Sequence, residues 1–258
     1  MPATTLDITA IPALTDNYIW LLDTGDGQCA VVDPGEAQPV LDVLEPRGLD
    51  LRYILLTHHH FDHVDGVPEL LEHTGASVYG PVDDRLSFVD TVCREGQEIR
   101  LDALGLAFQV LDIPAHTRSH IAFYGHGALF CGDTLFSIGC GRLFEGTAPD
   151  MQRALDKLAA LPVDTRVFCA HEYTQSNCAF ALAVEPDNTA LQHRASEVDR
   201  LRSNGEITLP STLGEELSCN PFMRTREDAV IEAARRRDPQ AAAGASTMAV
   251  IRAWKDRF

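Results

Sequence analysis

Residues 53–63, YILLTHHHFDH, carry the strongest signal in the sequence, because an apolar strand leads directly into a run of metal-binding side chains. His58 and His60 are two residues apart, so they project to the same side if the backbone after the strand is extended. Asp62 and His63 follow at the turn toward the next predicted helix and can point to a neighbouring position. One loop is therefore expected to supply ligands to two adjacent metal ions.

Three further candidate ligands also follow apolar strands. His116 comes after FQVLDI, Asp133 after ALFCG and His171 after RVFCA. In layered α/β proteins, ligands gather at the loops beyond strand ends, so these residues are expected to complete the site around the first loop. Asp133 is the natural bridging residue, because its two carboxylate oxygens can each bind one ion.

The chemistry of this set favours metal-dependent hydrolysis. Five imidazoles and two carboxylates suit zinc, iron or manganese better than calcium or copper(I). Two such ions lower the pKa of a bridging water to about 7 or below and polarise a substrate carbonyl. Nearby, Asp33, His59 and His120 are expected to support the ligands rather than bind metal.

The composition excludes several classes of protein. The chain has 258 residues, of which 45% are hydrophobic, as in a soluble globular protein with a substantial core. Its formal net charge of −17 argues against nucleic acid as a partner. The chain shows neither a signal-peptide pattern nor an apolar run of membrane-span length, so a cytoplasmic location without membrane binding is expected. Seven cysteines without a CxxC pair are expected to be reduced core thiols.

The pattern of elements changes near residue 171. Before it, six apolar runs read as strands: YIWLL, CAVVD, YILLT, AFQVLDI, ALFCG and RVFCA. Beyond it, helical periodicity dominates, and Thr225-x-x-Asp228 is expected to form a capping box that opens a helix ending near residues 235–237. Up to residue 171 the chain holds 10 basic and 25 acidic side chains, and beyond it 11 and 13. We therefore expect an α/β catalytic domain over 1–171 and a helical domain over 172–258. Further helices are expected over 68–73, 151–159, 191–201 and 248–254.

Several motifs together resemble a known family. THHHFDH, PAHT, CGDT and CAHEY resemble the metallo-β-lactamase fold superfamily. DNYIWLL, FCGDTLFSIGCGRLFEGTA, CAHEYTQSN, NPFMR and IRAWKDRF resemble, within it, glyoxalase II, the hydroxyacylglutathione hydrolases. The resemblance spans nearly the whole chain. It implies an α/β fold, a four-layer αββα sandwich, followed by a C-terminal helical domain that binds glutathione.

The resemblance also implies an activity and a ligand assignment. The reaction is hydrolysis of S-D-lactoylglutathione to D-lactate and glutathione by a metal-bridging hydroxide, the second step of methylglyoxal detoxification. Zinc is the first expectation for both ions, with iron or manganese as alternatives. Asp62 and Asp133 are the expected catalytic residues. By motif match, one ion takes His58, His60 and His116, the other takes Asp62, His63 and His171, and Asp133 bridges them.

The resemblance further implies a binding site for a small glutathione thioester, in a protein expected to be a monomer. The matching positions are Arg142, Phe144, Tyr173, Arg252 and Lys255. Arg252 and Lys255 are three residues apart on one helix, where they could bind the glycine carboxylate together.

The sequence also departs from the family pattern. Ala115 and Ser119 replace common glycines, Asp65 is added beside the metal loop, and Phe144 stands where some relatives have tyrosine.

Two other kinds of function fit parts of the sequence. The first is another hydrolase of the superfamily, a lactonase or a nuclease. A nuclease needs a basic groove, and a lactonase has no use for the Arg252 and Lys255 pair. The second is a non-catalytic metal-binding or redox-sensing protein, which would bind metal without turnover of any substrate.

Overall fold

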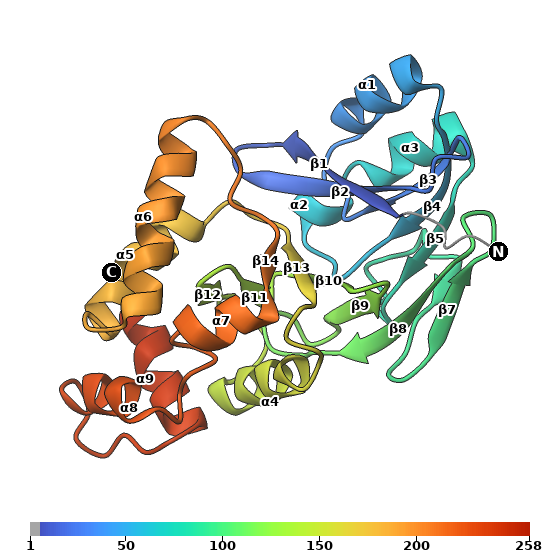
Figure 1. The fold of residues 1–258 in the computed structure, drawn as a ribbon. Coiled ribbons are helices and arrows are strands. Elements are labelled where there is room, and N and C mark those ends of the chain that lie inside the picture. The colour runs from blue at the N-terminus through green and yellow to red at the C-terminus, as the bar shows by residue number, and fades with distance from the viewer. Residues whose placement is uncertain (1–5) are drawn as a thin grey trace. The chain divides into compact units, whose positions relative to one another are not determined.

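The computed structural model describes residues 6–258, which fold into two compact units (Figure 1). The first unit holds residues 6–112 and 119–132, and the second holds residues 113–118 and 133–258. Over the described range, no helix combines the length and the apolar character needed to cross a membrane. The predicted domain boundary at residue 171 divides the chain by its sequence pattern, whereas these two units follow its packing. That boundary therefore stays a prediction.

A six-stranded sheet forms one part of the first unit, with its strands in chain order. The first three strands pair antiparallel, and the remaining pairs are parallel. Every residue of β2 is buried, which indicates that both faces of this part of the sheet are covered. The strands are β1 (Asp7–Ala13), β2 (Asn17–Asp23), β3 (Gln28–Val32), β4 (Asp50–Leu55), β5 (Ser77–Gly80) and β6 (Thr91–Val92).

Two helices pack on this sheet and one short helix carries part of the metal-binding motif. The helices are α1 (Gln38–Arg47), α2 (Phe61–Val64) and α3 (Val67–Thr74). Val40 and Leu44 of α1 share one apolar core with Val67 and Leu70 of α3 and with the strands. Gly75 ends α3 in the left-handed conformation, as expected for a helix that starts with proline and ends before glycine.

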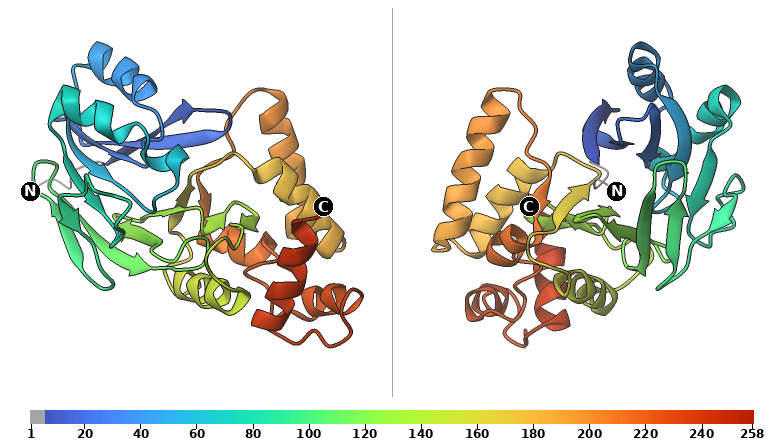
Figure 2. Two further views of the ribbon diagram at one scale, coloured as in Figure 1. Left: turned by 180° about the vertical axis from the view of Figure 1, so that it is seen from behind. Right: turned by 45° about the vertical axis from the view of Figure 1, so that its right-hand side comes forward.

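A second group of strands in the first unit forms an antiparallel meander. Its strands are β7 (Glu98–Leu101), β8 (Leu106–Asp112), β9 (Ile121–Gly125) and β10 (Ala128–Gly132), each paired with the next. Figure 2 shows this meander as a second layer beside the first sheet. The chain leaves the unit between β8 and β9 as residues 113–118, which contain His116.

The second unit is mainly helical. It contains the hairpin strands β11 (Leu135–Phe136) and β12 (Gly139–Cys140) and the antiparallel pair β13 (Arg166–Cys169) and β14 (Ser211–Thr212). Its helices are α4 (Ala148–Ala159), α5 (Thr174–Val184), α6 (Thr189–Ser203), α7 (Leu213–Cys219), α8 (Asp228–Arg235) and α9 (Ala245–Lys255). Side chains of α5, α6 and α7 pack around Ile138 of the hairpin turn in one core.

The predicted elements are confirmed, with one wrong detail. All six predicted strands and all five predicted helices are present. The capping box at Thr225 is wrong, because its hydroxyl donates to Gln152 Oε1 at 2.6 Å and Glu227 precedes the first turn of α8 instead. A capping box does form at the start of α4, between Thr147 and Asp150. All seven cysteines are buried thiols, as predicted.

Candidate metal centre

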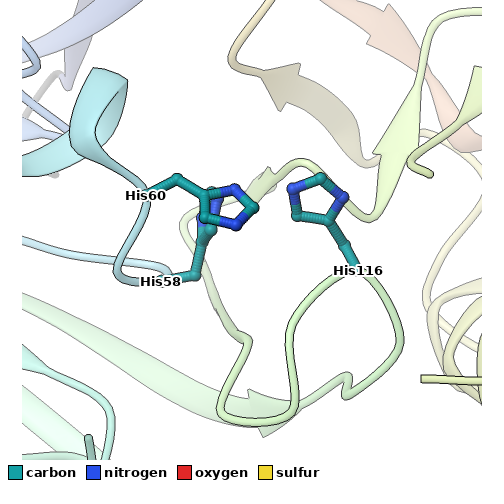
Figure 3. Close-up of side chains that lie close together, drawn as sticks. All are labelled: His58, His60 and His116. Atoms are coloured by element: carbon teal, nitrogen blue, oxygen red, sulfur yellow. The ribbon is translucent and has the colours of Figure 1, made fainter. Parts of the chain in front are cut away.

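The loop after β4 brings three histidines of the first unit together. His60 has an extended backbone, with φ −62° and ψ 145°, as its spacing from His58 requires. The ring centroids of His58 and His60 are 4.8 Å apart, and those of His58 and His63 are 4.1 Å apart. Figure 3 draws the His58 and His60 rings together with that of His116, which belongs to the second unit. His58 and His63 are fully buried, so the loop presents its imidazoles inward.

Asp33 fixes this loop from the end of β3. Its Oδ1 accepts the main-chain N–H of Thr57 at 2.8 Å, and its Oδ2 lies 2.7 Å from Thr57 Oγ1 and 3.0 Å from His63 Nδ1. A carboxylate at Nδ1 holds the His63 ring with Nε2 directed elsewhere, as second-sphere carboxylates do in metal sites. The ligand atoms of Asp33, His58 and His63 lie within 4.8 Å of one another. The predicted hydrogen bond between Asp33, as acceptor, and a candidate ligand is confirmed at His63.

Asp62 is oriented by a residue that sequence reasoning missed. Asn17, at the start of β2, donates from Nδ2 to Asp62 Oδ2 at 3.1 Å and to the Asp62 carbonyl at 3.2 Å. Asp62 Oδ2 also lies 3.5 Å from His63 Nε2. A Cβ at Gly35 would overlap the Asp62 carbonyl, so only glycine fits beside it. The only sequence signal for Asn17 is its place in the DNYIWLL motif.

His120 contacts a candidate ligand and His59 contacts an acid beside the loop, and their supporting role stays a prediction. The His120 ring stacks on the His58 ring, with centroids 4.5 Å apart and planes 16° apart. His59 Nδ1 lies 3.5 Å from Oδ2 of Asp83, a buried carboxylate on the loop after β5.

Asp83 was not predicted, and it is also bound by two other side chains. Arg85 donates to both of its oxygens at 2.7 Å, and Ser119 Oγ donates to Oδ2 at 2.6 Å. The Arg85 hydrogen bonds hold the pKa of the Asp83 carboxyl well below its usual range. The departure at Ser119 thus supplies a hydrogen bond that glycine would lack.

In the second unit, Asp133 lies between two imidazoles. Its Oδ2 is 3.4 Å from His116 Nε2, and its Oδ1 is 3.2 Å from His171 Nε2. All three side chains are buried. Each Asp133 oxygen therefore lies next to a different candidate imidazole ligand.

The His116 ring has a defined tautomer. Its Nδ1 lies 2.8 Å from the carbonyl of Arg142, and its own carbonyl accepts the N–H groups of Phe144 and Glu145 at 3.3 Å each. Because a carbonyl can only accept, Nδ1 carries a proton, which leaves Nε2 as the ring nitrogen available to a metal ion. The main chain of residues 142–145 thus holds both the ring and the backbone of His116 in place.

Aromatic rings surround the second-unit ligands. Tyr173 stacks on His171, with centroids 4.7 Å apart and planes 4° apart. Phe136 meets the edges of both rings, at 5.8 Å from His171 and 5.2 Å from Tyr173. Phe144 packs edge-on against His116 at 5.2 Å while remaining 62% exposed. The structure therefore places two of the predicted glutathione-binding residues directly on candidate metal ligands.

The predicted cationic residues differ in accessibility. Arg252 is only 4% exposed, and it donates to the Cys140 carbonyl at 2.7 Å and to Asp256 Oδ1 at 3.1 Å. Lys255 is half-buried, with its Nζ 3.3 Å from the Ser176 carbonyl. Burial, aided by the nearby Arg252 charge, lowers the pKa of Lys255 to about 8. Arg142 is exposed.

The donor set in each unit suits a divalent transition metal. The first unit contributes His58, His60, Asp62 and His63, and the second contributes His116, Asp133 and His171. Within each unit the candidate ligands lie close together, are mostly buried and are oriented by hydrogen bonds from other residues. Imidazole nitrogen and carboxylate oxygen are the ligands of zinc, iron and manganese in hydrolases. The chain therefore carries residues fit for divalent metal binding.

Comparison with protein families covers almost the whole chain. The metallo-β-lactamase superfamily model matches residues 14–171, and the model for the C-terminus of hydroxyacylglutathione hydrolase matches residues 172–258. Hydroxyacylglutathione hydrolases of Pseudomonas fluorescens and Pseudomonas aeruginosa are each 52% identical to the chain, with 98% of this chain and 100% of the relative covered.

Solved structures are similar in fold. The ETHE1 protein of Myxococcus xanthus aligns with a TM-score of 0.65 at 24% identity, covering 97% of this chain and 98% of its own. The BLEG-1 B3 metallo-β-lactamase aligns with a TM-score of 0.63 at 21% identity, covering 84% of this chain and 99% of its own. The predicted fold class is thereby confirmed: a metallo-β-lactamase fold of mixed sheets and helices, followed by a helical C-terminal region.

Proposed function

Because the chain belongs to the hydroxyacylglutathione hydrolase family, we propose that it hydrolyses S-D-lactoylglutathione to D-lactate and glutathione. The observation that carries the proposal is the 52% identity over 98% of the chain, which includes the C-terminal helical region as well as the metal-binding motifs. The C-terminal region matches this family and lies outside the part that matches the superfamily at large. It therefore favours a hydroxyacylglutathione hydrolase over a lactonase or a nuclease.

Seven residues would hold two divalent ions. We assign His58, His60 and His116 to one ion, Asp62, His63 and His171 to the other, and Asp133 to both. The two oxygens of Asp133, each facing a different imidazole, support its bridging role. Zinc is our first choice, and iron and manganese suit the same donors. When bound, the ions would make a water nucleophilic at neutral pH and polarise the thioester carbonyl.

Asp62 is the residue that we assign to orienting the attacking water and accepting its proton. The Asn17 amide donates to Asp62 Oδ2 and to the Asp62 main chain, so the carboxylate is held in one orientation. The leaving group needs little help, because a thiol with a pKa near 8.5 leaves readily as a thiolate. A strong general acid is therefore not required on the sulfur side.

The glutathione part of the substrate would contact Arg142, Phe144, Tyr173, Arg252 and Lys255. Tyr173 and Phe144 pack on His171 and His116, so a substrate held by these rings would lie beside candidate metal ligands. Lys255 and Arg142 are the more accessible cations, while Arg252 is bound to the Cys140 carbonyl. Cations are needed locally, because a protein with a net charge of −17 otherwise repels an anionic thioester.

We also propose that the protein is a monomer, that it is located in the cytoplasm and that its partner is a small molecule. The net charge supports the exclusion of nucleic acid as a partner.

The decisive assay uses purified, metal-loaded protein and S-D-lactoylglutathione, with release of glutathione as the readout. We expect turnover, together with a loss of about 1,000-fold or more in His58→Ala and Asp133→Ala, because each removes a metal ligand. A lactone and a phosphodiester serve as comparison substrates. The proposal would be overturned if the metal-loaded protein did not hydrolyse the thioester, or if His58→Ala and Asp133→Ala kept the wild-type rate.

A further inference from the structure

A segment of the second unit, which we call the strap (residues 134–145), connects Asp133 to the loop that carries His116. It starts directly after Asp133, forms the β11–β12 hairpin and ends where Arg142 and the next residues bind His116. At Gly141 a Cβ would overlap the Asp133 carbonyl and come within 3.1 Å of His116 Nδ1. The strap therefore touches both candidate ligands, and any displacement of it would move them.

The turn of the strap is held in a costly conformation. Ile138, at the turn, has φ +59°, a region that β-branched residues rarely adopt. Its side chain is fully buried in the core formed by helices α5, α6 and α7. Such strain persists only where the surrounding structure enforces it. The helices thus determine the position of the strap turn.

A buried carboxylate binds the main chain of this turn. Glu216, on α7, is fully buried, and its Oε2 accepts the Ile138 N–H at 2.8 Å and Asn220 Nδ2 at 2.9 Å. Burial raises the pKa of Glu216 to about 7, a sign of how unfavourable its charge is there. The strap therefore binds Glu216 through the Ile138 N–H.

Two buried amides bind the carbonyls of the same turn. Asn220 Nδ2 donates to the Gly139 carbonyl at 2.9 Å and to the Phe136 carbonyl at 3.3 Å. Asn177 Nδ2, on α5, donates to the Ser137 carbonyl at 3.0 Å. Buried main-chain groups are costly to leave without hydrogen bonds, so these amides favour one position of the turn. Figure 1 shows α7 beside β11 and β12.

We propose that Glu216, Asn220 and Asn177 are positioning residues that act through the strap to keep Asp133 and His116 in the arrangement required for metal binding. None of them touches Asp133 or His116 directly in the contacts described above. They fix the strap at its turn, while the Arg142 carbonyl fixes His116 at its far end. For its effect on turnover, this inference rests on the proposed function, but its effect on metal retention does not.

The experiment compares two neighbouring acids on α7. Glu216→Leu removes the acceptor of the Ile138 N–H, whereas Glu216→Gln keeps a carbonyl oxygen in its place. Glu215→Leu is the matched control, because Glu215 is the neighbouring acid on the same helix and pairs with Arg194 at 3.0 Å. Zinc-loaded proteins are mixed with a chromogenic chelator, and the rate of zinc loss, the Tm, kcat and KM are measured.

We expect Glu216→Leu to lose zinc about 10-fold faster and to lose a similar factor in kcat, as for other second-sphere changes. Glu216→Gln should give the wild-type rate of zinc loss to within about twofold, since its amide oxygen can still accept the Ile138 N–H. Glu215→Leu should lower Tm without changing zinc loss. Zinc loss at the wild-type rate in Glu216→Leu, or an equal acceleration in Glu215→Leu, would overturn the proposal.

A milder variant covers the case in which Glu216→Leu does not fold. Asn177→Ala removes one hydrogen bond to the strap, and we expect zinc loss to be about 3-fold faster. An unchanged rate in a folded Asn177→Ala protein would also count against the proposal. If the wild type did not hydrolyse the thioester, the proposed function would fail, and the zinc-loss comparison would still decide the role of the strap.

Discussion

The two units hold their candidate metal ligands by different means. In the first unit, four ligands lie within six residues on one loop, and Asp33 and Asn17 orient that loop from neighbouring strands. In the second unit, three ligands come from three separate segments, and the strap links two of them. A ligand set that is compact in sequence needs side-chain support from outside. A dispersed set needs a connecting segment whose own position is fixed.

The largest effect is expected at Asp33, the outside support of the first unit. Asp33→Ala removes the acceptor for Thr57 and His63, and we expect metal affinity to fall about 10- to 100-fold. Competition with a chelator measures this change. Asp102→Ala, at an exposed acid of the same unit, should leave the affinity unchanged. Equal affinities in wild type and Asp33→Ala would show that the compact loop needs no such support.

A second prediction concerns the pH dependence of substrate binding in the second unit. Since the pKa of Lys255 is lowered to about 8, this residue loses its positive charge as the pH rises through that value. If Lys255 binds the glycine carboxylate, KM should rise about 10-fold between pH 7 and pH 9. In Lys255→Arg the charge persists over this range, so KM should stay nearly constant. A wild-type KM that is flat with pH would exclude a direct role for Lys255.

The third prediction tests how much the buried Glu216 carboxylate lowers the stability of the protein as the pH rises. The pKa of Glu216 is raised from 4.5 to about 7, so the folded protein retains this proton at pH values where the unfolded chain has lost it. Its contribution to stability therefore falls as the pH rises from about 4.5 to about 7. Glu216→Gln does not titrate, so we expect its Tm, relative to metal-free wild type, to increase by about 5 to 10 °C over that range.

A difference in Tm that does not change with pH between these two proteins would show that Glu216 stays ionised without cost. In that case the strap would be held by a charge that the surrounding amides fully compensate.

The smallest effect is expected at Ser119 in the first unit. Ser119→Ala removes the hydrogen bond to Asp83 but leaves the two bonds from Arg85. We expect a loss of about 1 kcal/mol in the free energy of unfolding, measured by urea denaturation. Metal affinity should stay at the wild-type value, because Asp83 contacts the metal loop at His59, which is not a candidate ligand. A change in metal affinity would mean that the supports of the loop are coupled.

The sequence predicted those parts of the fold whose signals are local. The apolar runs of β2, β3 and β4 and the proline-to-glycine pattern of α3 lie within short windows and were recognised. The two-residue strands β6, β11, β12 and β14 are too short to show any periodicity. The Thr225 prediction failed because the hydroxyl binds Gln152, a partner far away in the sequence. A local rule cannot take such a competitor into account.

For the site, the same limit separates ligands from their supports. The density of histidines at 58–63 and the position of Asp133 after a strand made the candidate ligands visible. Asn17, Asp83 and Glu216 belong to common residue types in ordinary surroundings, and only the folded chain brings them to their partners. Their roles are set by tertiary contacts at long sequence separation, which periodicity and spacing do not encode.

The burial of every thiol has a consequence for a protein that would release glutathione. Disulfide exchange requires an accessible thiolate, and burial raises the pKa of four cysteines to about 12 and that of Cys219 to about 11. Oxidised glutathione therefore meets no accessible thiol at the surface of residues 6–258. Catalysis should continue unchanged during oxidative stress, when the glutathione pool shifts toward its disulfide and many exposed cysteines become glutathionylated. The four cysteines with a pKa near 12 are Cys29, Cys93, Cys169 and Cys178.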